Sequence, residues 1–474
     1  MSRTIFELLA DVQSGKSTAR GLVETALAKL GDVQAEFNIA IGVAKERALE
    51  RAAAIDAARA RGEKPGRLAG IPFIVKDNFL TFGVKTTAAS KILEPFEAPY
   101  QSTAIERLEA EGAIMIAKAN LDAFAHGSST ENSFYGPTKN PHDKTRVPGG
   151  SSGGPAAAVA LDIVPFALGT DTGGSVRLPA SYCGVVGFKP TYGSVSRYGV
   201  VAMASSTDTI GVLATTADDA ALVHDIMAGQ DVRDSTTLPD RSASYLPKDN
   251  PLGTLKIGII KEYMSDGLAA DVRERIEARI ADLRKLGHSV EEISLPAVDL
   301  ALAIYYIVVP AEVSSNLFRH DGIKFGYRAP EAGTLDDIYG LTRDQGFMPE
   351  NKRRILIGTY VLSSGYYDAY YRKAQTARTM LIDQFKKAFE SYDLLLGPTA
   401  PTTAFKIGEN ASDPLQMYLA DIMTVSASLA GLPAISVPSG CGEGNLPIGL
   451  QLIGPQRSDA TLFSLAKQLE ENHG

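Results

Sequence analysis

The sequence predicts an α/β fold in which helices cover the faces of a β-sheet. Short apolar runs of strand length lie at 71–75 and 113–117, with a helical pattern at 103–111 between them. A second strand–helix–strand pattern spans 256–295, where apolar residues recur every three or four positions from 272 to 286. This alternation is typical of a sheet flanked by helices. With no internal repeat and no low-complexity tail, it favours a single domain.

The start of the chain, about residues 1–65, is expected to be helical. Apolar stripes occupy 8–12 and 22–30, and Ser17 and Thr18 are candidate N-caps for the second stripe. The Ala-rich, charged segment 43–61 is typical of a solvent-facing helix.

Residues of about 66–215 are predicted to form a core rich in Gly, Ser and Thr. Apolar runs at 156–160, 163–168 and 185–188 interrupt this composition, and a flexible linker would lack them. We therefore expect a folded core whose loops approach each other, or a ligand, closely.

The remainder, 216–474, is expected to complete the same domain, which would span 1–474. Residues 366–390, with many tyrosines, are predicted to be helical, and 393–399 and 433–438 are predicted strands.

Composition excludes several classes of protein. The 474 residues carry 47 Lys and Arg against 55 Asp and Glu, a net charge of −8, so direct nucleic-acid binding by this chain alone is not expected. The two cysteines, Cys183 and Cys441, exclude a disulfide framework and a zinc ribbon, and we expect a reducing cytoplasmic compartment. There is no apolar run of about 18 residues, so no membrane span is predicted. The six histidines form no HExxH pair, and no metal site is expected.

Three segments combine residues that could carry chemistry: Lys76, the loop 149–154 (GGSSGG) and the loop 169–175 (GTDTGGS). A phosphate-binding P-loop is excluded, because Pro and Ala follow the glycines at 154. Residues 149–153 fit the G-x-S-x-G nucleophile elbow, but that fold needs a later acid and histidine, and His473 is the penultimate residue. A turn-rich loop without chemistry is the plain alternative for either loop.

Taken together, the three segments favour acyl transfer by a serine. A serine hydroxyl needs a base, and a lysine can serve if its pKa falls from about 10.4 to about 7, a cost of about 4–5 kcal/mol that burial can impose. Lys76 ends an apolar strand, although its ammonium could instead pair with Asp77 or extend to water. Ser151 could take a proton from Ser175 and pass its own to Lys76. The backbone N–H groups of Thr172, Gly173, Gly174 and Ser175 could hold an oxyanion.

At these residues the chain resembles the amidase signature family. The similar motifs are VPGGSSGG at 147–154, GTDTGGSVR at 169–177 and CGVVGFKPT at 183–191. Lys76 lies 75 residues before Ser151, which lies 24 before Ser175, and these intervals fit the family. The resemblance implies Ser175 as nucleophile, Ser151 as cis-serine relay and Lys76 as base. It also implies the amidase signature fold, a large mixed central β-sheet covered by helices on both faces.

Segments 120–132, 314–322, 353–355 and 365–371 resemble, more narrowly, the A subunits of glutamyl-tRNA(Gln) amidotransferases. The similarity covers about residues 4–470.

That narrower resemblance implies that Arg354 and Asp421 hold free glutamine, with Tyr305 and Ser128 lining the same pocket. A guanidinium can clamp the α-carboxylate and a carboxylate can take the α-ammonium. The alternatives are a surface charge for Arg354, a helix cap for Asp421 and a core tyrosine at 305 or 306.

The same resemblance implies a heterotrimeric ligase of protein biosynthesis. Ammonia from glutamine would pass to the B subunit, which would amidate glutamyl-tRNA(Gln) with ATP and Mg²⁺, and a small C subunit would stabilise this chain. No cofactor is expected in this chain itself. The resemblance leaves open whether aspartyl-tRNA(Asn) is also a substrate. The alternatives are a stand-alone amidase for small or aryl amides and a non-catalytic scaffold protein.

The chain departs from the family at five positions. His126 stands where Met is usual and Leu178 where Gln is usual, and Thr207, Thr209 and Val212 replace the usual Leu, Gln and Pro. His126 and Leu178 are expected beside the site, where His126 could be mistaken for a base.

Overall fold

A mixed β-sheet forms the centre of the protein in the computed structural model, which describes residues 3–239, 243–247, 252–410 and 413–472. Within these residues the sheet has 11 strands, with both parallel and antiparallel neighbours. Across the sheet the strands are β1 (Ala40–Val43), β3 (Ile114–Ala119), β2 (Pro72–Lys76), β4 (Phe166–Asp171), β6 (Thr209–Ala214), β5 (Val186–Lys189), β10 (Ala434–Cys441), β11 (Pro447–Ile453), β9 (Leu394–Pro398), β7 (Lys256–Ile260) and β8 (Ser289–Ile293).

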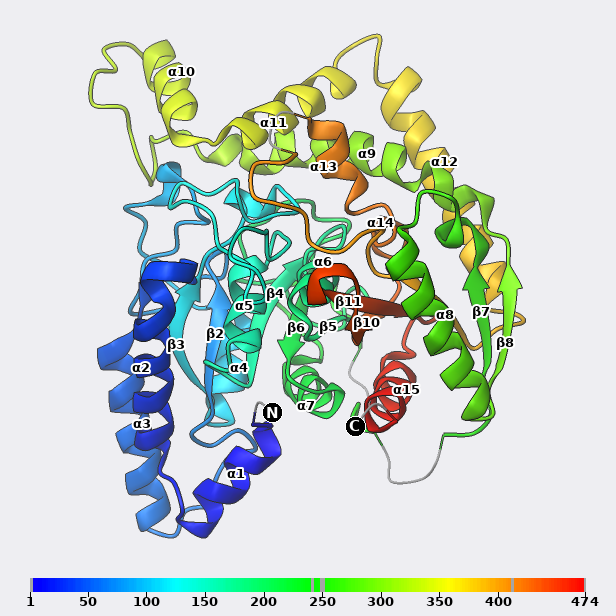
Figure 1. The fold of residues 1–474 in the computed structure, drawn as a ribbon. Helices are drawn as coiled ribbons and strands as arrows, with labels where there is room; N and C mark the ends of the chain where they lie inside the picture. Colours follow the sequence, from blue (N-terminus) through cyan, green and yellow to red (C-terminus); the bar gives the residue numbers. More distant parts are fainter. Residues whose placement is uncertain (1–2, 240–242, 248–251, 411–412, 473–474) are drawn as a thin grey trace.

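Helices surround this sheet (Figure 1). They are α1 (Ile5–Ser14), α2 (Ala19–Phe37), α3 (Lys45–Ala60), α4 (Thr103–Ala110), α5 (Gly153–Ala160), α6 (Arg177–Cys183), α7 (Ala217–Met227), α8 (Ala270–Lys285), α9 (Ala301–Asn316), α10 (Leu335–Gly346), α11 (Pro349–Leu362), α12 (Lys373–Ala388), α13 (Pro414–Leu419), α14 (Val425–Leu429) and α15 (Asp459–Glu471).

Apolar cores lie on both faces of the sheet, which explains the continuous hydrophobic run of β2. Phe73 and Val75 pack into one cluster with α4 and α7, whereas Ile74 packs into another with α2 and α5. A strand covered on both faces has no polar side in its sequence. The predicted α/β class, with a large mixed sheet between helices, is confirmed. The domain boundaries expected from the sequence stay a prediction.

Most of the predicted elements are present, with corrections in detail. Thr18 caps α2 by accepting a hydrogen bond from the Gly21 amide. The N-terminal part is not wholly helical, because it contains the strand β1, which pairs with β3 of the central sheet. The segment expected to be helical at 366–390 contains a short π-helical turn, Asp368–Arg372, before α12.

One described helical stretch, Pro296–Arg319, is long and apolar enough to cross a membrane by composition, and it includes α9. In the structure 56% of its most apolar window is buried in protein, and apolar residues of α9 such as Ile304 and Val308 belong to the core. We interpret it as a core helix.

Helices α9 and α11 cross very closely at one end of the molecule (Figure 1). A Cβ atom added at Gly358 of α11 would lie 1.8 Å from the carbonyl oxygen of Pro310 in α9. Only glycine allows this close approach. The crossing fixes the position along α9 at which α11 places Arg354, which lies one helical turn before Gly358.

We predict that Gly358→Ala lowers the free energy of unfolding by about 1–3 kcal/mol, because the added methyl group must push the two helices apart. Denaturant unfolding measures this. Gly340→Ala is the matched control, since Gly340 also lies in a helix but nothing lies within 4 Å of the added atom. It should be neutral or stabilising by up to about 1 kcal/mol. Equal effects of the two substitutions would contradict the close crossing.

Candidate active site

Lys76, at the end of β2, is fully buried and surrounded by hydroxyl groups. Its Nζ donates hydrogen bonds to Ser151 Oγ at 2.7 Å, Ser152 Oγ at 2.9 Å and Thr170 Oγ1 at 3.0 Å. The neighbouring Asp77, considered as its partner from the sequence, pairs instead with Lys118 at 2.7 Å. The amine of Lys76 is therefore solvated by neutral oxygens rather than neutralised by the carboxylate next to it in the chain.

This environment lowers the pKa of Lys76 to about 7. Burial is the main cause, because it disfavours the charged ammonium. The carboxylates of Asp122, Asp171 and Asp208 partly oppose the shift. At neutral pH a large fraction of the amine is uncharged and able to accept a proton.

Ser151 lies just before α5, and its peptide bond with Gly150 is cis. The neighbouring amide of Ser152 donates to the carbonyl of Ser175 at 3.1 Å, so the loop that carries Ser175 lies directly against the Ser151–Ser152 segment. Among the described residues no hydrogen bond joins the hydroxyls of Ser151 and Ser175. The structure thus brings Lys76 onto Ser151, while the step from Ser151 to Ser175 stays a prediction.

The backbone of residues 172–175 forms a candidate oxyanion site. None of these four amides donates to an acceptor within the described part of the chain. Glycines are required here by close approach: a Cβ at Gly173 would lie 2.7 Å from the Tyr305 ring, and one at Gly174, where φ is +150°, would lie 3.3 Å from Asp421 Oδ1. Tyr305 and Asp421 therefore lie directly beside the loop that carries these four amides.

A buried ion pair between Asp171 and Arg177 flanks this loop on both sides in the sequence and holds it in place. Asp171, at the end of β4, accepts two hydrogen bonds from Arg177, each of 2.9 Å. Burial alone would raise the pKa of Asp171, but Arg177 reverses this and the pKa is lowered. Arg177 also donates to the Thr424 carbonyl at 3.0 Å and to Gln451 at 2.6 Å. Sequence reasoning missed this role, although Arg177 lies inside the motif.

Asp208 also contacts this loop, and sequence reasoning did not predict its role either. It accepts a hydrogen bond from the Thr172 hydroxyl at 2.8 Å and others from the amides of Met203 and Ala204. Burial raises its pKa to about 6. An isolated Asp between two threonines gives no signal of such a role in the sequence.

Arg354 is buried on α11 and is not the surface charge that its neighbour Arg353 suggested. Its Nε donates to Glu350 at 2.8 Å, and its guanidinium lies 5.2 Å from the Tyr306 ring and 5.7 Å from the Tyr418 ring. Tyr305 is buried beside Gly173, so both tyrosines that the sequence left open lie near the site.

Asp421 is buried, and the hydroxyl of Ser128 donates to it. Burial raises the pKa of Asp421 to about 7, against the lowering by Ser128 and by the positive charge of Arg354. A bound ammonium group would restore its charge. The structure therefore places Ser128 and Asp421 beside the loop of Ser175, with the charge of Arg354 acting on Asp421. The glutamine-binding roles of these residues stay a prediction.

Two cavities adjoin this centre. One of about 290 Å³ is lined by Arg354, Glu350, Tyr418, His126 and Asp122, among others. It offers room for a small polar ligand beside the guanidinium.

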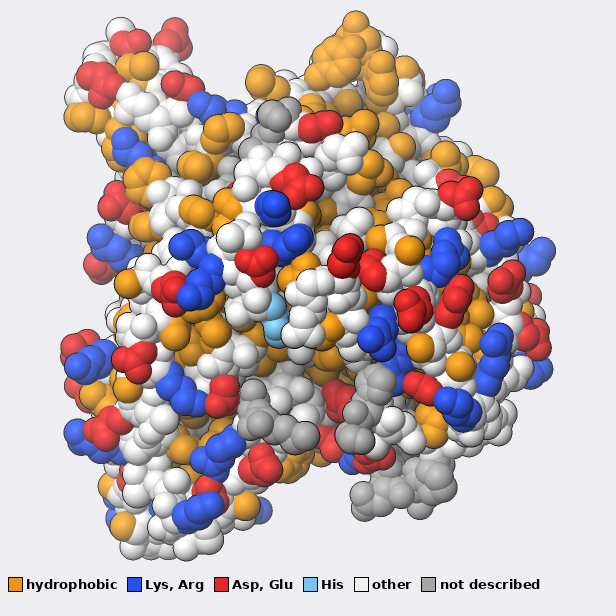
Figure 2. All heavy atoms as spheres, viewed as in Figure 1, with side chains coloured by type: hydrophobic (Ala, Val, Ile, Leu, Met, Phe, Trp, Pro, Cys, Tyr) orange, Lys and Arg blue, Asp and Glu red, His pale blue; other side chains and the backbone are white. Residues whose placement is uncertain are grey.

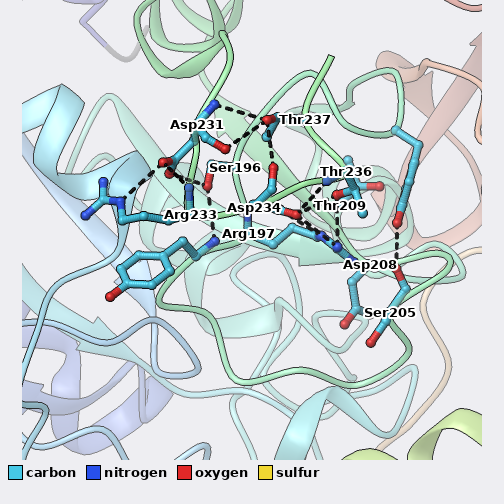
Figure 3. A network of polar contacts seen from close by, with 12 residues as sticks. Ser196, Arg197, Ser205, Asp208, Thr209, Asp231, Arg233, Asp234, Thr236 and Thr237 are labelled. Carbon is cyan, nitrogen blue, oxygen red and sulfur yellow. Dashed lines mark hydrogen bonds and ion pairs between the residues drawn. The ribbon is translucent and has the colours of Figure 1, made fainter. Parts of the chain in front are cut away.

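The second cavity, of about 210 Å³, is lined in part by Thr170, whose hydroxyl accepts a hydrogen bond from Lys76. Figure 3 shows the charged network around it. Arg197 pairs there with Asp234 at 3.2 Å, and Arg233 pairs with Asp231 at 3.2 Å.

Of the departures from the family, only His126 lines the first cavity. Leu178 packs in a small apolar cluster, Thr209 and Val212 belong to β6, and the Thr207 hydroxyl bonds back to the Ala204 carbonyl. His473, the histidine considered for a hydrolase triad, lies outside the described residues.

The chain is similar to known proteins over nearly its whole length. The sequence model of the family described as Amidase matches residues 21–463. The A subunit of the glutamyl-tRNA(Gln) amidotransferase of Nostoc punctiforme is 51% identical, over 99% of this chain and 97% of that protein. Its counterpart in Koribacter versatilis is 50% identical, over 97% and 96%. The crystal structure of the A subunit from Thermotoga maritima is 40% identical, with a TM-score of 0.81 over 99% of this chain and 94% of that one.

We predict that an organophosphonate reagent modifies Ser175 at a rate that rises with pH around a midpoint of about 7. The reason is that only neutral Lys76 can accept the proton, so the rate at pH 6 should be about tenfold below its plateau. Lys76→Met should slow the modification by about 10²-fold or more.

Lys189→Met is the matched control for this measurement. Lys189 is also buried with a pKa lowered to about 7, but its Nζ donates to the Pro190 carbonyl. The midpoint should persist in this variant. A midpoint near 10 in the unsubstituted protein would contradict the assignment of Lys76 as base.

Proposed function

The chain belongs to the amidase family, and from that premise we propose that it is the A subunit of a glutamyl-tRNA(Gln) amidotransferase, the enzyme that releases ammonia from glutamine. One observation carries the proposal: a buried Lys76, with its pKa lowered to about 7, contacts Ser151, and the adjoining loop of Ser175 lies against Asp421. The similarity to A subunits of this kind over nearly the whole chain supports it.

Free glutamine carries charges that complement the two recognition residues. Arg354 would bind the α-carboxylate, and Asp421 with Ser128 would bind the α-ammonium. Asp421 lies beside Gly174, so a ligand held there reaches the oxyanion site with its side-chain amide. A simple amide needs neither charge partner.

The reaction would then proceed by acyl transfer to Ser175. Its Oγ attacks the amide carbon while its proton passes to Ser151 and the Ser151 proton passes to Lys76. The amides of 172–175 stabilise the negative charge on the tetrahedral oxygen. Lys76 returns the proton through Ser151 to the leaving nitrogen, ammonia departs, and water hydrolyses the acyl-enzyme to glutamate.

The ammonia would serve a partner, the B subunit, which we expect to bind ATP, Mg²⁺ and the glutamyl-tRNA, with a small C subunit holding this chain. The cavity beside Thr170 is the candidate exit, since it starts next to Lys76. Acidic and basic side chains are interspersed on the face in Figure 2, without a basic stripe, which fits a tRNA held by the partner. Aspartyl-tRNA(Asn) is a second acceptor to be tested with the assembled complex. Both cysteines are free, in keeping with a cytoplasmic protein.

Exposed hydrophobic side chains gather over α11 and the segment that leads to α12, as Figure 2 shows. They are Leu356, Tyr360, Leu362, Tyr366, Tyr367 and Tyr370. Such a surface suits the interfaces of a heterotrimer.

We predict that Ser175→Ala abolishes glutamine hydrolysis, with a loss of more than about 10³-fold, because no other hydroxyl receives the acyl group. Lys76→Ala should do nearly the same. Ammonia release measures the activity, and an unchanged unfolding midpoint verifies the fold. Equal glutamine turnover by the unsubstituted protein and Ser175→Ala would contradict this mechanism.

We also predict that Arg354→Ala raises KM for glutamine by at least about 30-fold, since a desolvated carboxylate would lose its partner. The unsubstituted protein should prefer glutamine strongly over butanamide, and the substitution should erase that preference. If butanamide is turned over as fast as glutamine, and Arg354→Ala does not change either rate, the protein is instead a stand-alone amidase.

A further inference from the structure

His126 presents an unused hydrogen-bond donor next to the cavity that Arg354 lines. The side chain is fully buried and follows the short turn Ala123–Ala125. Its Nδ1 lies 2.7 Å from Asn351 Nδ2, whereas its Nε2, also buried, has no hydrogen-bond partner among the described residues.

Asn351 fixes which ring nitrogen carries the proton. Its Nδ2 donates to the Ala123 carbonyl at 2.8 Å, and its Oδ1 accepts from the Met348 amide at 3.2 Å. These two backbone partners set the orientation of the amide, so it is an N–H that points at His126. Nδ1 must then accept, and the proton of the neutral ring resides on Nε2.

The ring stays neutral in this position. Burial lowers the pKa of His126 well below its usual range, and the positive charge of Arg354 adds to the effect. A buried N–H without an acceptor is unfavourable, and an oxygen of a ligand in the adjoining cavity would supply that acceptor. Beside a guanidinium, the oxygen that gains most is a carboxylate oxygen.

We propose that His126 Nε2–H is a second donor, alongside Arg354, to the carboxylate of the substrate. The inference rests on the proposed function and deepens it: the site would select amides that carry a carboxylate, here an α-amino acid, through two donors instead of one. Methionine, usual at this position in the family that the sequence resembles, has no N–H to offer, so this selection would distinguish the chain from its relatives.

Three substitutions separate this role from a structural one. His126→Asn places an acceptor near the Nδ1 position and keeps the Asn351 contact, but it removes the donor. His126→Gln places an N–H near the Nε2 position and gives up the Asn351 contact. His126→Met removes both polar groups in a side chain that the family accommodates.

The test measures dissociation constants by calorimetry in the full chain with Ser175→Ala, so that bound amides are not consumed. The ligands are L-glutamine and 4-aminobutanamide, which is glutamine without its carboxylate. We expect glutamine to bind at least about tenfold more weakly to the Asn and Met variants, and less than about threefold more weakly to the Gln variant. The affinity for 4-aminobutanamide should not depend on residue 126.

Two results would overturn the inference alone: unchanged glutamine affinity in the Asn and Met variants, or equal weakening of both ligands. A structural role through the Asn351 contact predicts a different pattern: Asn would be tolerated, whereas Gln and Met, which both give up that contact, would weaken binding. Failure of glutamine to bind when His126 is intact would overturn the proposed function together with this inference, which distinguishes the two failures.

Discussion

The active site depends on one constraint, an amine held away from water among hydroxyl groups. Lowering the pKa of Lys76 from 10.5 to about 7 corresponds to about 5 kcal/mol against the charged form. The fold imposes this through β2, which is covered by apolar cores on both faces and ends at Lys76. The hydroxyls of Ser151, Ser152 and Thr170 satisfy the amine without neutralising it. A carboxylate in direct contact, such as the one that Lys118 has in Asp77, would have favoured the ammonium.

The second property of the site is that the loop of Ser175 is shared between chemistry and recognition. Arg177 ties Asp171, at the start of the loop, to the backbone of Thr424, and Thr424 in turn donates to the Gly173 carbonyl at 2.7 Å. Asp421 lies one turn before Thr424. A ligand that pulls on Asp421 therefore acts on the same segment that supplies the oxyanion amides. In the proposed mechanism, substrate recognition and transition-state stabilisation would be coupled through these few short contacts.

Sequence reasoning pointed to the loops and the strand that meet at this site. The Gly-rich motifs and the apolar strand before Lys76 predicted a buried lysine close to Ser151, because close backbone approach and burial leave a pattern in the sequence, and the structure shows that contact. The roles of nucleophile, relay and base stay predictions. Arg354 and Asp421 came from resemblance, since a buried Arg beside an exposed one looks like any helix surface. Asp208 and Asn351 could not be found: each acts through contacts between segments more than 30 residues apart, which no local pattern records. For the fold, β2 was predicted by its continuous apolar run and α8 by its hydrophobic periodicity. The short edge strand β1, inside a helical region, was not.

The titration of Lys76 itself is the most direct test of the proposed proton route. In protein labelled with ¹⁵N at lysine Nζ, the chemical shift of this group can be followed against pH, with Lys76→Met used to assign the resonance and to separate it from Lys189. We expect a midpoint near 7. A Lys76 that keeps its proton above pH 9 would contradict the central claim, because such an ammonium could not accept the proton of Ser175 by way of Ser151.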